Sequence, residues 1–359
     1  MSNSVKILSI NPGSTSTKIA VFSNEDNVFL KNIKHSADDL AGFTHIADQF
    51  EFRKNIILKE LKDAGINIQE LSYIVGRGGL VKPIPSGLYE VNEALITDLK
   101  KGVQGEHASN LGGLIAKDLA NTIQGARAFI ADPVVVDELE PIARISGHPA
   151  VERISIFHAL NQKAIARTYA RELGRPYESL NLIIAHLGGG VSVGAHKQGK
   201  VIDVNNALDG DGPFSPERSG GLPVGSLVKL CFSGQYSLEE VKKIICGKGG
   251  YVGYLGTNDA YQVEQKAAAG DEKAKAIQEA MAYQIGKEIG AMAAVLKGKV
   301  DAILFTGGIA HSKSFIADVS EMVAFIAPIK VYPGEDEMKA LAMNAFMLHK
   351  GEIEIKQYR

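Results

Sequence analysis

The sequence lacks tryptophan, has only two cysteines, and contains no apolar run near the ~18 residues that a membrane-spanning helix needs. Cys231 and Cys246 are spaced as neither a CxxC motif nor a zinc site, which argues against a disulfide or a structural metal. The first residues, Met1 to Ser4, are not followed by the apolar stretch of a signal peptide. We therefore expect a cytoplasmic protein without a membrane partner.

An excess of charge of one sign is also missing. The formal net charge is −2, so no overall positive field draws the chain to nucleic acid or to an anionic membrane. The chain does have enough apolar sequence for a full core, 45% of its residues, as is typical of soluble globular proteins. At roughly 150 residues per domain, its length predicts two domains.

A polar turn between two apolar runs stands near the start of the chain. Residues 7–22 are apolar at both ends, which predicts two strands, and Asn11-Pro12-Gly13 between them is turn sequence. Hydroxyls on Ser14 and Ser16, the ammonium group of Lys18 and exposed backbone N–H groups suit an oxyanion such as phosphate. An ordinary hairpin with a polar tip would explain the same residues. The spacing does not match a Walker A loop.

The same pattern recurs in the second half of the chain. In 182–195 an apolar run leads through His186 to Gly188, Gly189 and Gly190, and an alternating run follows. Two phosphate-type hairpins far apart in one chain predict two related domains that face one cleft.

Charged side chains follow two of the other predicted strands. Arg77 stands in Gly76-Arg77-Gly78-Gly79 after the apolar run 71–75, and Asp132 follows the run 128–131. The end of a buried strand in an α/β protein lies at the edge where ligands usually bind. Both residues are therefore candidates for ligand contact, although a turn with a surface arginine explains Arg77 equally well.

Three further segments carry candidates with structural alternatives. His107 and Ser109 open a predicted helix and could meet an anion there, but a helix cap is the commoner reason for such residues. His158 precedes another predicted helix, and its local context favours a core histidine. The stretch 206–223 has too much glycine and proline for regular structure, and Arg218 is its single cation. Long irregular loops of this kind are often functional.

The last third of the chain predicts two helices and two strand ends. Apolar periodicity indicates helices at 274–297 and 338–349, in addition to an earlier helix at 43–64. The strand 301–306 ends in Gly307-Gly308, where a flat ligand can pack against backbone. Glu335-Asp336-Glu337 would bind a cation or would simply favour the start of the last helix.

Taken in order, five of these stretches resemble the acetate kinase family, within the superfamily of sugar kinases, heat-shock chaperone ATPases and actin. The resemblance covers nearly the whole chain. Each stretch is a weak or moderate signal alone, but their shared order is a strong one. They are Asn11 to Lys18, Gly76 to Gly79, His186 to Gly190, Arg218-Ser219-Gly220 and Phe305 to Ile309.

The chain departs from acetate kinases proper in ways that look like the butyrate kinases of this family. Gly189 stands where acetate kinases carry asparagine, and Gln162 where the family has a second histidine. Tyr261 replaces an arginine of the family's nucleotide loop, two residues after Asp259. The chain is also shorter than typical acetate kinases. These changes affect the expected phosphate and adenine contacts rather than the expected reaction.

The resemblance implies reversible phosphoryl transfer between ATP and a short-chain carboxylate, butyrate by the departures above, with Mg²⁺. Residues matched to the family's motifs receive roles on that basis alone. The implied catalytic residues are Arg77, Asp132, His158 and Arg218. The implied phosphate-binding residues are Asn11, Ser14, Ser16, Lys18, His107, His186, Gly188, Gly189 and Gly190. Asp259, Gly307, Gly308 and Ile309 are expected at the nucleotide, Glu337 and Asn11 at the metal, and Phe157, Pro213 and Phe214 in the wall of the acyl pocket.

The implied architecture is α/β, with two domains of duplicated actin-like ATPase (ribonuclease H-like) topology and nucleotide in the interdomain cleft. We expect residues 1–147 with the returning helix 340–359 to form one domain, and 148–339 to form the nucleotide-binding domain. The family implies a homodimer or larger homo-oligomer, with no nucleic-acid partner. Acetate, propionate or branched-chain acid kinases share the motifs. A nucleotide-binding regulator without transferase activity is the alternative of another class, and an unrelated α/β protein with polar turns would require five accidental matches.

Overall fold

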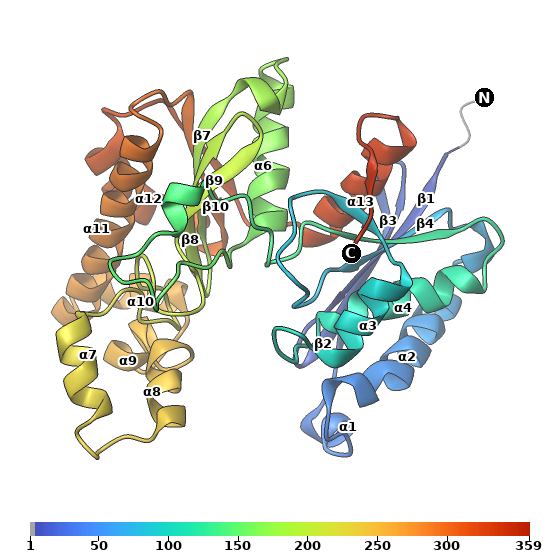
Figure 1. The fold of residues 1–359 in the computed structure, drawn as a ribbon, viewed down its shortest axis with the longest axis horizontal. Coiled ribbons are helices and arrows are strands. Elements are labelled where there is room, and N and C mark those ends of the chain that lie inside the picture. Colours follow the sequence, from blue (N-terminus) through green and yellow to red (C-terminus); the bar gives the residue numbers. More distant parts are fainter. Residues whose placement is uncertain (1–3) are drawn as a thin grey trace. The chain divides into compact units, whose positions relative to one another are not determined.

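The computed structural model describes residues 4–359 and separates into two compact units, each of which holds its own sheet and core (Figure 1). Unit 1 comprises the chain up to Val136 together with Asp336–Arg359, and unit 2 comprises Asp137–Glu335. Among residues 4–359, none of the helices combines the length and the apolar character needed to cross a membrane.

Unit 1 is built on a seven-stranded mixed sheet in the order β12-β5-β6-β4-β1-β2-β3. The central strands β1, β4 and β6 run parallel, and β1, β2 and β3 form an antiparallel meander. Their apolar side chains, such as Ile7, Leu8 and Ile10, are fully buried. The strands are β1 (Lys6–Pro12), β2 (Ser16–Ser23), β3 (Asp26–Lys34), β4 (Tyr73–Arg77), β5 (Leu88–Glu90), β6 (Arg127–Ala131) and β12 (Ile355–Lys356).

Helices cover the sheet of unit 1. The buried α4 packs on β4, β6 and β1, and α13, which follows the last strand of unit 2, packs on β1 and its neighbours. Gly76 and Gly112 let α4 lie directly against β4, because a Cβ at Gly112 would come within 2.9 Å of the Arg77 nitrogen. The helices are α1 (Ala37–Leu40), α2 (Phe50–Asp63), α3 (Glu93–Lys101), α4 (Asn110–Asn121) and α13 (Glu337–His349), with 3₁₀ turns at Ile46–Gln49 and Ile68–Glu70.

Unit 2 contains a five-stranded mixed sheet in the order β11-β10-β7-β8-β9. Strand β7 pairs antiparallel with β8 and parallel with β10, and β10 pairs parallel with β11. Strands β7 and β10 are buried on both faces, which explains why their sequences are almost entirely apolar. The strands are β7 (Asn181–Leu187), β8 (Val191–Lys197), β9 (Lys200–Val204), β10 (Ala302–Gly307) and β11 (Ile329–Pro333).

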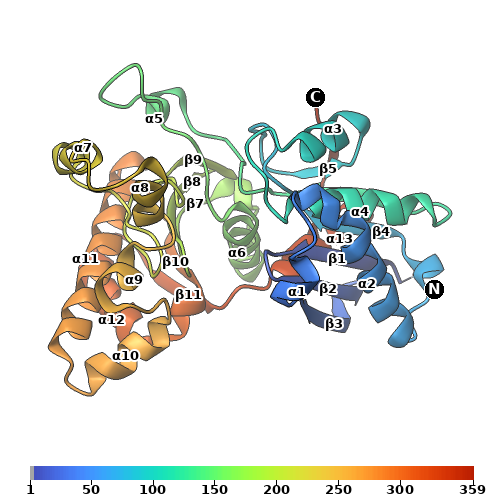
Figure 2. The ribbon, with the colours of Figure 1, turned by 90° about the horizontal axis from the view of Figure 1, so that it is seen from below.

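Two sets of helices pack on this second sheet, as Figure 2 shows. The helix α6 contacts β7 and β10, whereas α11 contacts β7 and β8 and packs against α10 and α12. The helices are α5 (Pro141–Arg144), α6 (Ala159–Glu172), α7 (Val224–Cys231), α8 (Leu238–Ile245), α9 (Gly250–Leu255), α10 (Ala260–Ala268), α11 (Glu272–Val295) and α12 (Lys313–Val323), with 3₁₀ turns at Tyr177–Ser179 and Gly308–His311.

The two sheets share one topology. In each, three antiparallel strands are followed by two strands parallel to the first, as β3-β2-β1-β4-β6 in unit 1 and β9-β8-β7-β10-β11 in unit 2. The predicted α/β fold with a duplicated topology is therefore confirmed. The place of a nucleotide relative to both units stays a prediction.

One predicted helix was wrong in its first part. The segment 43–64 was expected to be one helix, but a 3₁₀ turn at Ile46–Gln49 precedes α2, which begins at Phe50. The helix α2 buries Arg53, Ile57 and Leu61, which are spaced by four residues. The chain thus places an arginine on the apolar stripe of this helix.

Candidate functional site

Three of the predicted residues are linked at one edge of unit 1. Asn11 is near the end of β1, Arg77 is the last residue of β4, and Glu337 is the first residue of α13. The amide nitrogen of Asn11 donates a hydrogen bond to Glu337, and Arg77 forms an ion pair with the same carboxylate. The carboxyl ends of two parallel strands and the start of a helix therefore bring these residues together, and their roles stay a prediction.

His107 lies within the electrostatic reach of this group. Its Nδ1 accepts a hydrogen bond from the backbone N–H of Ser109 at 3.2 Å, and it also contacts the Ser109 hydroxyl at 2.8 Å. Partial burial of the imidazole and the positive charges of Arg77 and Arg53 lower the pKa of His107. Burial is the larger cause of this shift, and the two arginines add to it.

Asp132 follows β6 at the same sheet edge, in a strained backbone conformation. Its φ is +37° and its side chain is buried. The carboxylate accepts hydrogen bonds from the Ser86 hydroxyl at 2.6 Å and the Gly87 N–H at 2.8 Å. Arg77 pairs in register with Ala131, the residue directly before Asp132. Arg77 and Asp132 therefore lie within one residue of the same register position on the neighbouring strands β4 and β6.

The hydroxyl-rich turn lies between β1 and β2. Asn11 and Lys18 are partners in the hairpin register, and the turn itself closes with a 2.8 Å hydrogen bond from the Gly13 N–H to the Ser16 carbonyl. Ser14 is exposed and Ser16 is partly exposed. The side chains of Ser14, Ser16 and Lys18 thus reach the surface to different degrees, and their contact with a phosphate stays a prediction.

Two histidines predicted separately stack on each other in unit 2. The rings of His158 and His186 have centroids 3.9 Å apart with planes inclined by 15°. His158 Nδ1 lies 2.8 Å from the Ser192 hydroxyl, and His186 Nδ1 lies 2.9 Å from Asn161 Oδ1. Glu335 faces His186 Nε2 at 3.3 Å. The structure thus brings the two histidines together, and their role at the phosphates stays a prediction.

Arg218 contacts the tip of the second hairpin. A Cβ at Gly190 would come within 2.6 Å of the Arg218 guanidinium carbon, so only glycine leaves room for this arrangement. The Arg218 guanidinium also donates to the Ala207 carbonyl. Its Nε is buried and has no acceptor among the described residues. A buried guanidinium donor without a protein acceptor is suited to an incoming anion.

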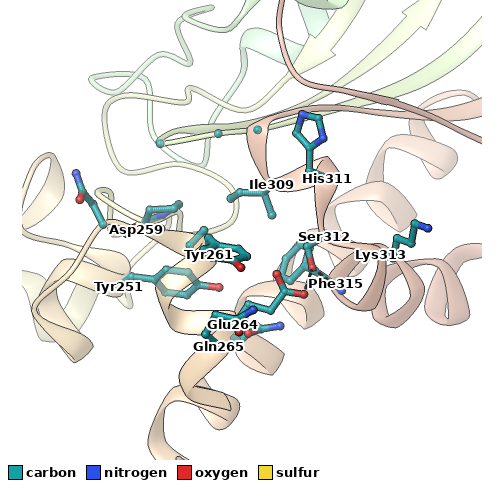
Figure 3. A pocket seen from close by; sticks show the side chains of 17 residues that line it. Tyr251, Asp259, Tyr261, Glu264, Gln265, Ile309, His311, Ser312, Lys313 and Phe315 are labelled. Atoms are coloured by element: carbon teal, nitrogen blue, oxygen red, sulfur yellow. Dashed lines mark hydrogen bonds between the residues drawn. The ribbon is translucent and has the colours of Figure 1, made fainter. Parts of the chain in front are cut away.

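A pocket of about 540 Å³ lies in unit 2 beside the second hairpin (Figure 3). It brings together Gly188, Gly189, Asp259, Gly308 and Ile309 from the predicted set. Gly307 does not line it. This glycine instead has φ +92° and packs against the Leu187 carbonyl, where a Cβ would lie within 2.6 Å of the Leu187 carbonyl carbon. Its role in this structure is close backbone packing.

Several residues of this pocket carried no motif in the sequence. Glu264 accepts hydrogen bonds from the hydroxyls of Ser312 at 2.7 Å and Ser314 at 2.6 Å, and Figure 3 shows Glu264 directed toward Ser312. Burial, and secondarily the Glu264 charge, raise the pKa of the pocket residue Tyr251. Gln278 on α11 has a buried Oε1 with no partner among the described residues. No spacing rule marks these residues, because they come from four separate helices, α9 to α12.

All three residues expected in an acyl pocket are buried. Phe157 is 2% exposed, directly before α6, and Phe214 is 6% exposed within the core of unit 2. The Phe214 ring packs against Tyr251 and Tyr254, with centroids 6.4 Å apart in each case. Phe214 therefore supports the wall of the pocket that Tyr251 lines. The acyl role of Phe157, Pro213 and Phe214 stays a prediction.

The architecture matches solved structures of the same fold. The acetate kinase of Porphyromonas gingivalis aligns with 96% of this chain and 100% of its own, at a TM-score of 0.78 and 20% identity. A propionate kinase from Francisella tularensis aligns at a TM-score of 0.73. A ROK family protein from Streptococcus pneumoniae aligns at 0.52. The fold is thus the actin-like ATPase fold that acetate kinases and ROK proteins share.

Sequence similarity defines the family within this class. Residues 150–338 match the Acetokinase family. "Butyrate kinase 2" of Clostridium acetobutylicum is 59% identical over 354 residues, which cover 99% of each chain, and "Butyrate kinase 1" of the same organism is 55% identical over equal coverage. The chain belongs to the acetokinase family, and the resemblance inferred from its five motifs is confirmed.

Proposed function

We propose that this protein is a butyrate kinase, which transfers a phosphoryl group reversibly between ATP and butyrate. The observation that carries the proposal is the 59% identity to "Butyrate kinase 2" across 99% of both chains. Such identity over the full length leaves little room for a different reaction. The linked Asn11, Arg77 and Glu337 and the paired His158 and His186 support it.

In the forward direction, a butyrate carboxylate oxygen forms a bond to the γ-phosphorus of ATP. The bond from that phosphorus to the β,γ-bridging oxygen breaks, and ADP leaves with the electron pair. No general base is needed, because a carboxylic acid with a pKa of about 4 is already ionised at pH 7. Catalysis therefore rests on positioning and on neutralising charge.

The matched residues supply different groups for this reaction. In unit 2, the glycines 188–190, His186 and the pocket lined by Asp259 and Ile309 bind the nucleotide. Arg218 in unit 2 and Arg77 in unit 1 provide planar, permanently charged guanidinium groups for the carboxylate and the transferring phosphoryl group. Asp132 orients these groups, and the hydroxyls of the first hairpin receive the phosphoryl oxygens.

Mg²⁺ fits the oxygen donors of unit 1. This ion is usually held by one or two carboxylates together with substrate phosphates. Glu337 supplies a carboxylate, and Asn11 beside it supplies an amide oxygen. Among residues 4–359 no group of three or more Asp, Glu, His or Cys could hold a metal without a substrate. When bound with ATP, Mg²⁺ neutralises charge on the phosphate oxygens.

An acyl-hydroxamate assay tests the proposal. Purified protein is incubated with ATP, Mg²⁺ and acetate, propionate, butyrate, isobutyrate or valerate, and the acyl phosphate is trapped with hydroxylamine. We expect the highest kcat/KM with butyrate. Each buried methylene contributes about 0.8 kcal/mol, so neighbouring acids should differ by roughly fourfold.

Each other outcome has a definite meaning. A maximum with isobutyrate or acetate would change the substrate and keep the mechanism. No acyl phosphate from any acid, with ATP binding intact, would overturn the proposal in favour of a nucleotide-binding regulator. Light scattering during size-exclusion chromatography tests the homodimer or larger assembly that we also propose. Exposed apolar side chains in unit 2, including Ile142, Ile145 and Phe232, support such an assembly.

A further inference from the structure

A buried arginine lies beneath the first hairpin and has no part in the roles assigned above. Arg53 belongs to α2 and its side chain is fully buried, at 0% exposure. It shares the buried stripe of this helix with Ile57 and Leu61, which are core residues of unit 1. An arginine at such a position costs solvation energy, so its interactions need an explanation.

The guanidinium group of Arg53 is directed at the hydroxyl-rich turn. Three of its hydrogen bonds go to backbone carbonyls of this turn, and the remaining ones go to two side chains. Nη1 donates to the carbonyls of Gly13 at 2.8 Å and Ser16 at 2.9 Å, and to the Thr17 hydroxyl at 3.0 Å. Nη2 donates to the Ser14 carbonyl at 3.2 Å. Gln49 Oε1 accepts from Nε at 3.0 Å and from Nη2 at 2.8 Å.

Binding of the carbonyls matters for a loop that faces an anion. Carbonyl oxygens carry partial negative charge and repel phosphate, whereas N–H and O–H groups attract it. Arg53 draws the carbonyls of Gly13, Ser14 and Ser16 toward the interior. The outer side of the turn is left to N–H groups and to the hydroxyls of Ser14 and Ser16.

The charge of Arg53 is not balanced by its hydrogen-bond partners. Every acceptor named above is a neutral oxygen. Burial lowers the pKa of Arg53 to about 10, so it still carries its charge at pH 7. A buried cation held by neutral groups leaves a positive potential that a nearby anion can satisfy.

The neighbouring His35 is neutral, so it neither adds to nor offsets the charge of Arg53. The Thr17 hydroxyl accepts from Arg53, so its proton is directed to His35 Nε2, 2.8 Å away. Nε2 is then an acceptor and the ring carries its proton on Nδ1, which has no partner among the described residues. Burial and the Arg53 charge lower the pKa of His35, which keeps the ring neutral.

We propose that Arg53 is a positioning residue for phosphoryl transfer, which turns the hairpin carbonyls inward and supplies positive potential beneath the transferring phosphoryl group. The inference rests on the proposed function for the identity of the anion. It assigns to α2 a role that none of the matched motifs contains. A purely structural Arg53 would hold the turn together without affecting the chemical step.

Two substitutions separate these roles. Arg53→Met removes the charge and the hydrogen bonds, and Arg53→Lys keeps the charge but loses the fork that reaches several carbonyls. We expect kcat to fall about 100-fold in Arg53→Met and about 10-fold in Arg53→Lys, with KM for ATP within about threefold of the wild type in both. The partial rescue by lysine measures the contribution of charge.

Ile57→Ala is the matched control for stability. Ile57 lies one turn further along α2, is fully buried, and makes none of the hairpin contacts of Arg53. All variants are assayed at a temperature where circular dichroism shows them folded. We expect Ile57→Ala to lower the Tm and to keep kcat within about twofold. A kcat for Arg53→Met within about threefold of the wild type, or losses of kcat that follow the Tm in both variants, would overturn the inference.

Hydrogen exchange of substrate-free protein provides a test that does not depend on activity. We expect the backbone amides of residues 13–18 to exchange at least about tenfold faster in Arg53→Met than in Ile57→Ala, because the turn loses its internal donor. Unchanged exchange would overturn the positioning role. An inactive wild-type enzyme with faster exchange in Arg53→Met would overturn the butyrate kinase proposal and the catalytic part of the Arg53 proposal, and would leave only the ordering of the turn by Arg53.

Discussion

The two hairpins of this protein have the same topology but present positive charge in different ways. In unit 1, the turn between β1 and β2 carries hydroxyls, and the guanidinium group of Arg53 lies buried beneath it. In unit 2, the turn between β7 and β8 consists of three glycines, and Arg218 lies directly against Gly190. The first turn is held by a side chain of the helix α2. The second turn has no side chains of its own, which leaves space for Arg218 from a loop.

This difference leads us to expect a different role for each turn. Hydroxyl-bearing residues need a fixed backbone to aim their donors, and Arg53 fixes that backbone through three carbonyls. Glycines offer bare N–H groups and close approach, and they leave the orientation of the ligand to neighbouring side chains. We therefore expect the first hairpin to control the chemical step and the second to control nucleotide binding, together with Arg218.

The largest effect is expected from Arg218. Arg218→Ala removes the guanidinium group that lies against the second hairpin, so charge that develops during transfer is no longer neutralised. We expect kcat to fall about 1,000-fold or more while the Kd for ATP changes less than about threefold. Hydroxamate kinetics and isothermal titration calorimetry measure the two quantities. Near-normal turnover would show that unit 2 does not supply a catalytic arginine.

Gly190→Ala tests the close approach in the second hairpin. The new methyl group would lie within 2.6 Å of the Arg218 guanidinium carbon and would displace it. We expect kcat to fall about 100-fold. Gly189→Ala is the comparison, because a Cβ there meets nothing nearer than Glu217 at 3.6 Å. Equal losses in the two variants would mean that the backbone of the turn matters and the position of Arg218 does not.

Phe157→Ala tests whether Phe157, which precedes the stacked His158, determines the preference for acyl chain length. Removal of this buried ring, directly before His158, enlarges the space near the predicted acyl pocket. We expect the ratio of kcat/KM for valerate to that for butyrate to rise about tenfold, with little change in KM for ATP. The carboxylate series of the hydroxamate assay measures this ratio. An unchanged chain-length profile would remove Phe157 from the acyl pocket.

The smallest effect is expected from a substitution of Glu288 in unit 2. This residue is acidic, whereas the charged residues at the two hairpins, Arg53 and Arg218, are basic. Burial and the charges of Asp211 and Asp203 raise the pKa of Glu288 to about 7, against an opposing effect of Arg153. Because folding raises this pKa, the folded state prefers the protonated acid and loses stability as the pH rises from about 4.5 to about 7. Glu288→Gln should remove that loss and be more stable than the wild type at pH 8 by about 1 to 2 kcal/mol.

Urea unfolding at pH 5 and at pH 8 measures this difference. The stability gain of Glu288→Gln should be small at pH 5 and larger at pH 8. None of the proposed catalytic residues is among the groups that shift the pKa of Glu288, so kcat should stay within about twofold. A gain that is equal at both pH values would contradict the raised pKa.

Local sequence patterns were sufficient to predict most strands and the residues at the sheet edge where we expect the ligand to bind. Asn11, Arg77 and Asp132 lie at or directly after the ends of buried strands, and parallel strands that start at one edge must end at the other. The predicted residues at these ends therefore fall at one edge of unit 1, where Arg77 and Asn11 share Glu337. Apolar runs also predicted β7 and β10, because strands buried on both faces contain few polar residues.

Periodicity failed where a polar residue occupies a buried position. Arg53 falls on the same face of α2 as Ile57 and Leu61, yet a charged residue in a helix is ordinarily assigned to solvent. The pocket residues Glu264, Gln278 and Ser312 come from α10, α11 and the start of α12. Their proximity arises from helix packing, which no local spacing encodes.

The sequence alone therefore determined the repeated strand–turn–strand units, the family and the residues at the strand ends, because these depend on local apolar patterns and on motifs in a shared order. Only the tertiary structure decided that His158 stacks on His186, that Arg218 requires Gly190, and that Arg53 lies beneath the first hairpin. The physical reason is that the burial and partners of a charged side chain depend on which distant elements pack around it.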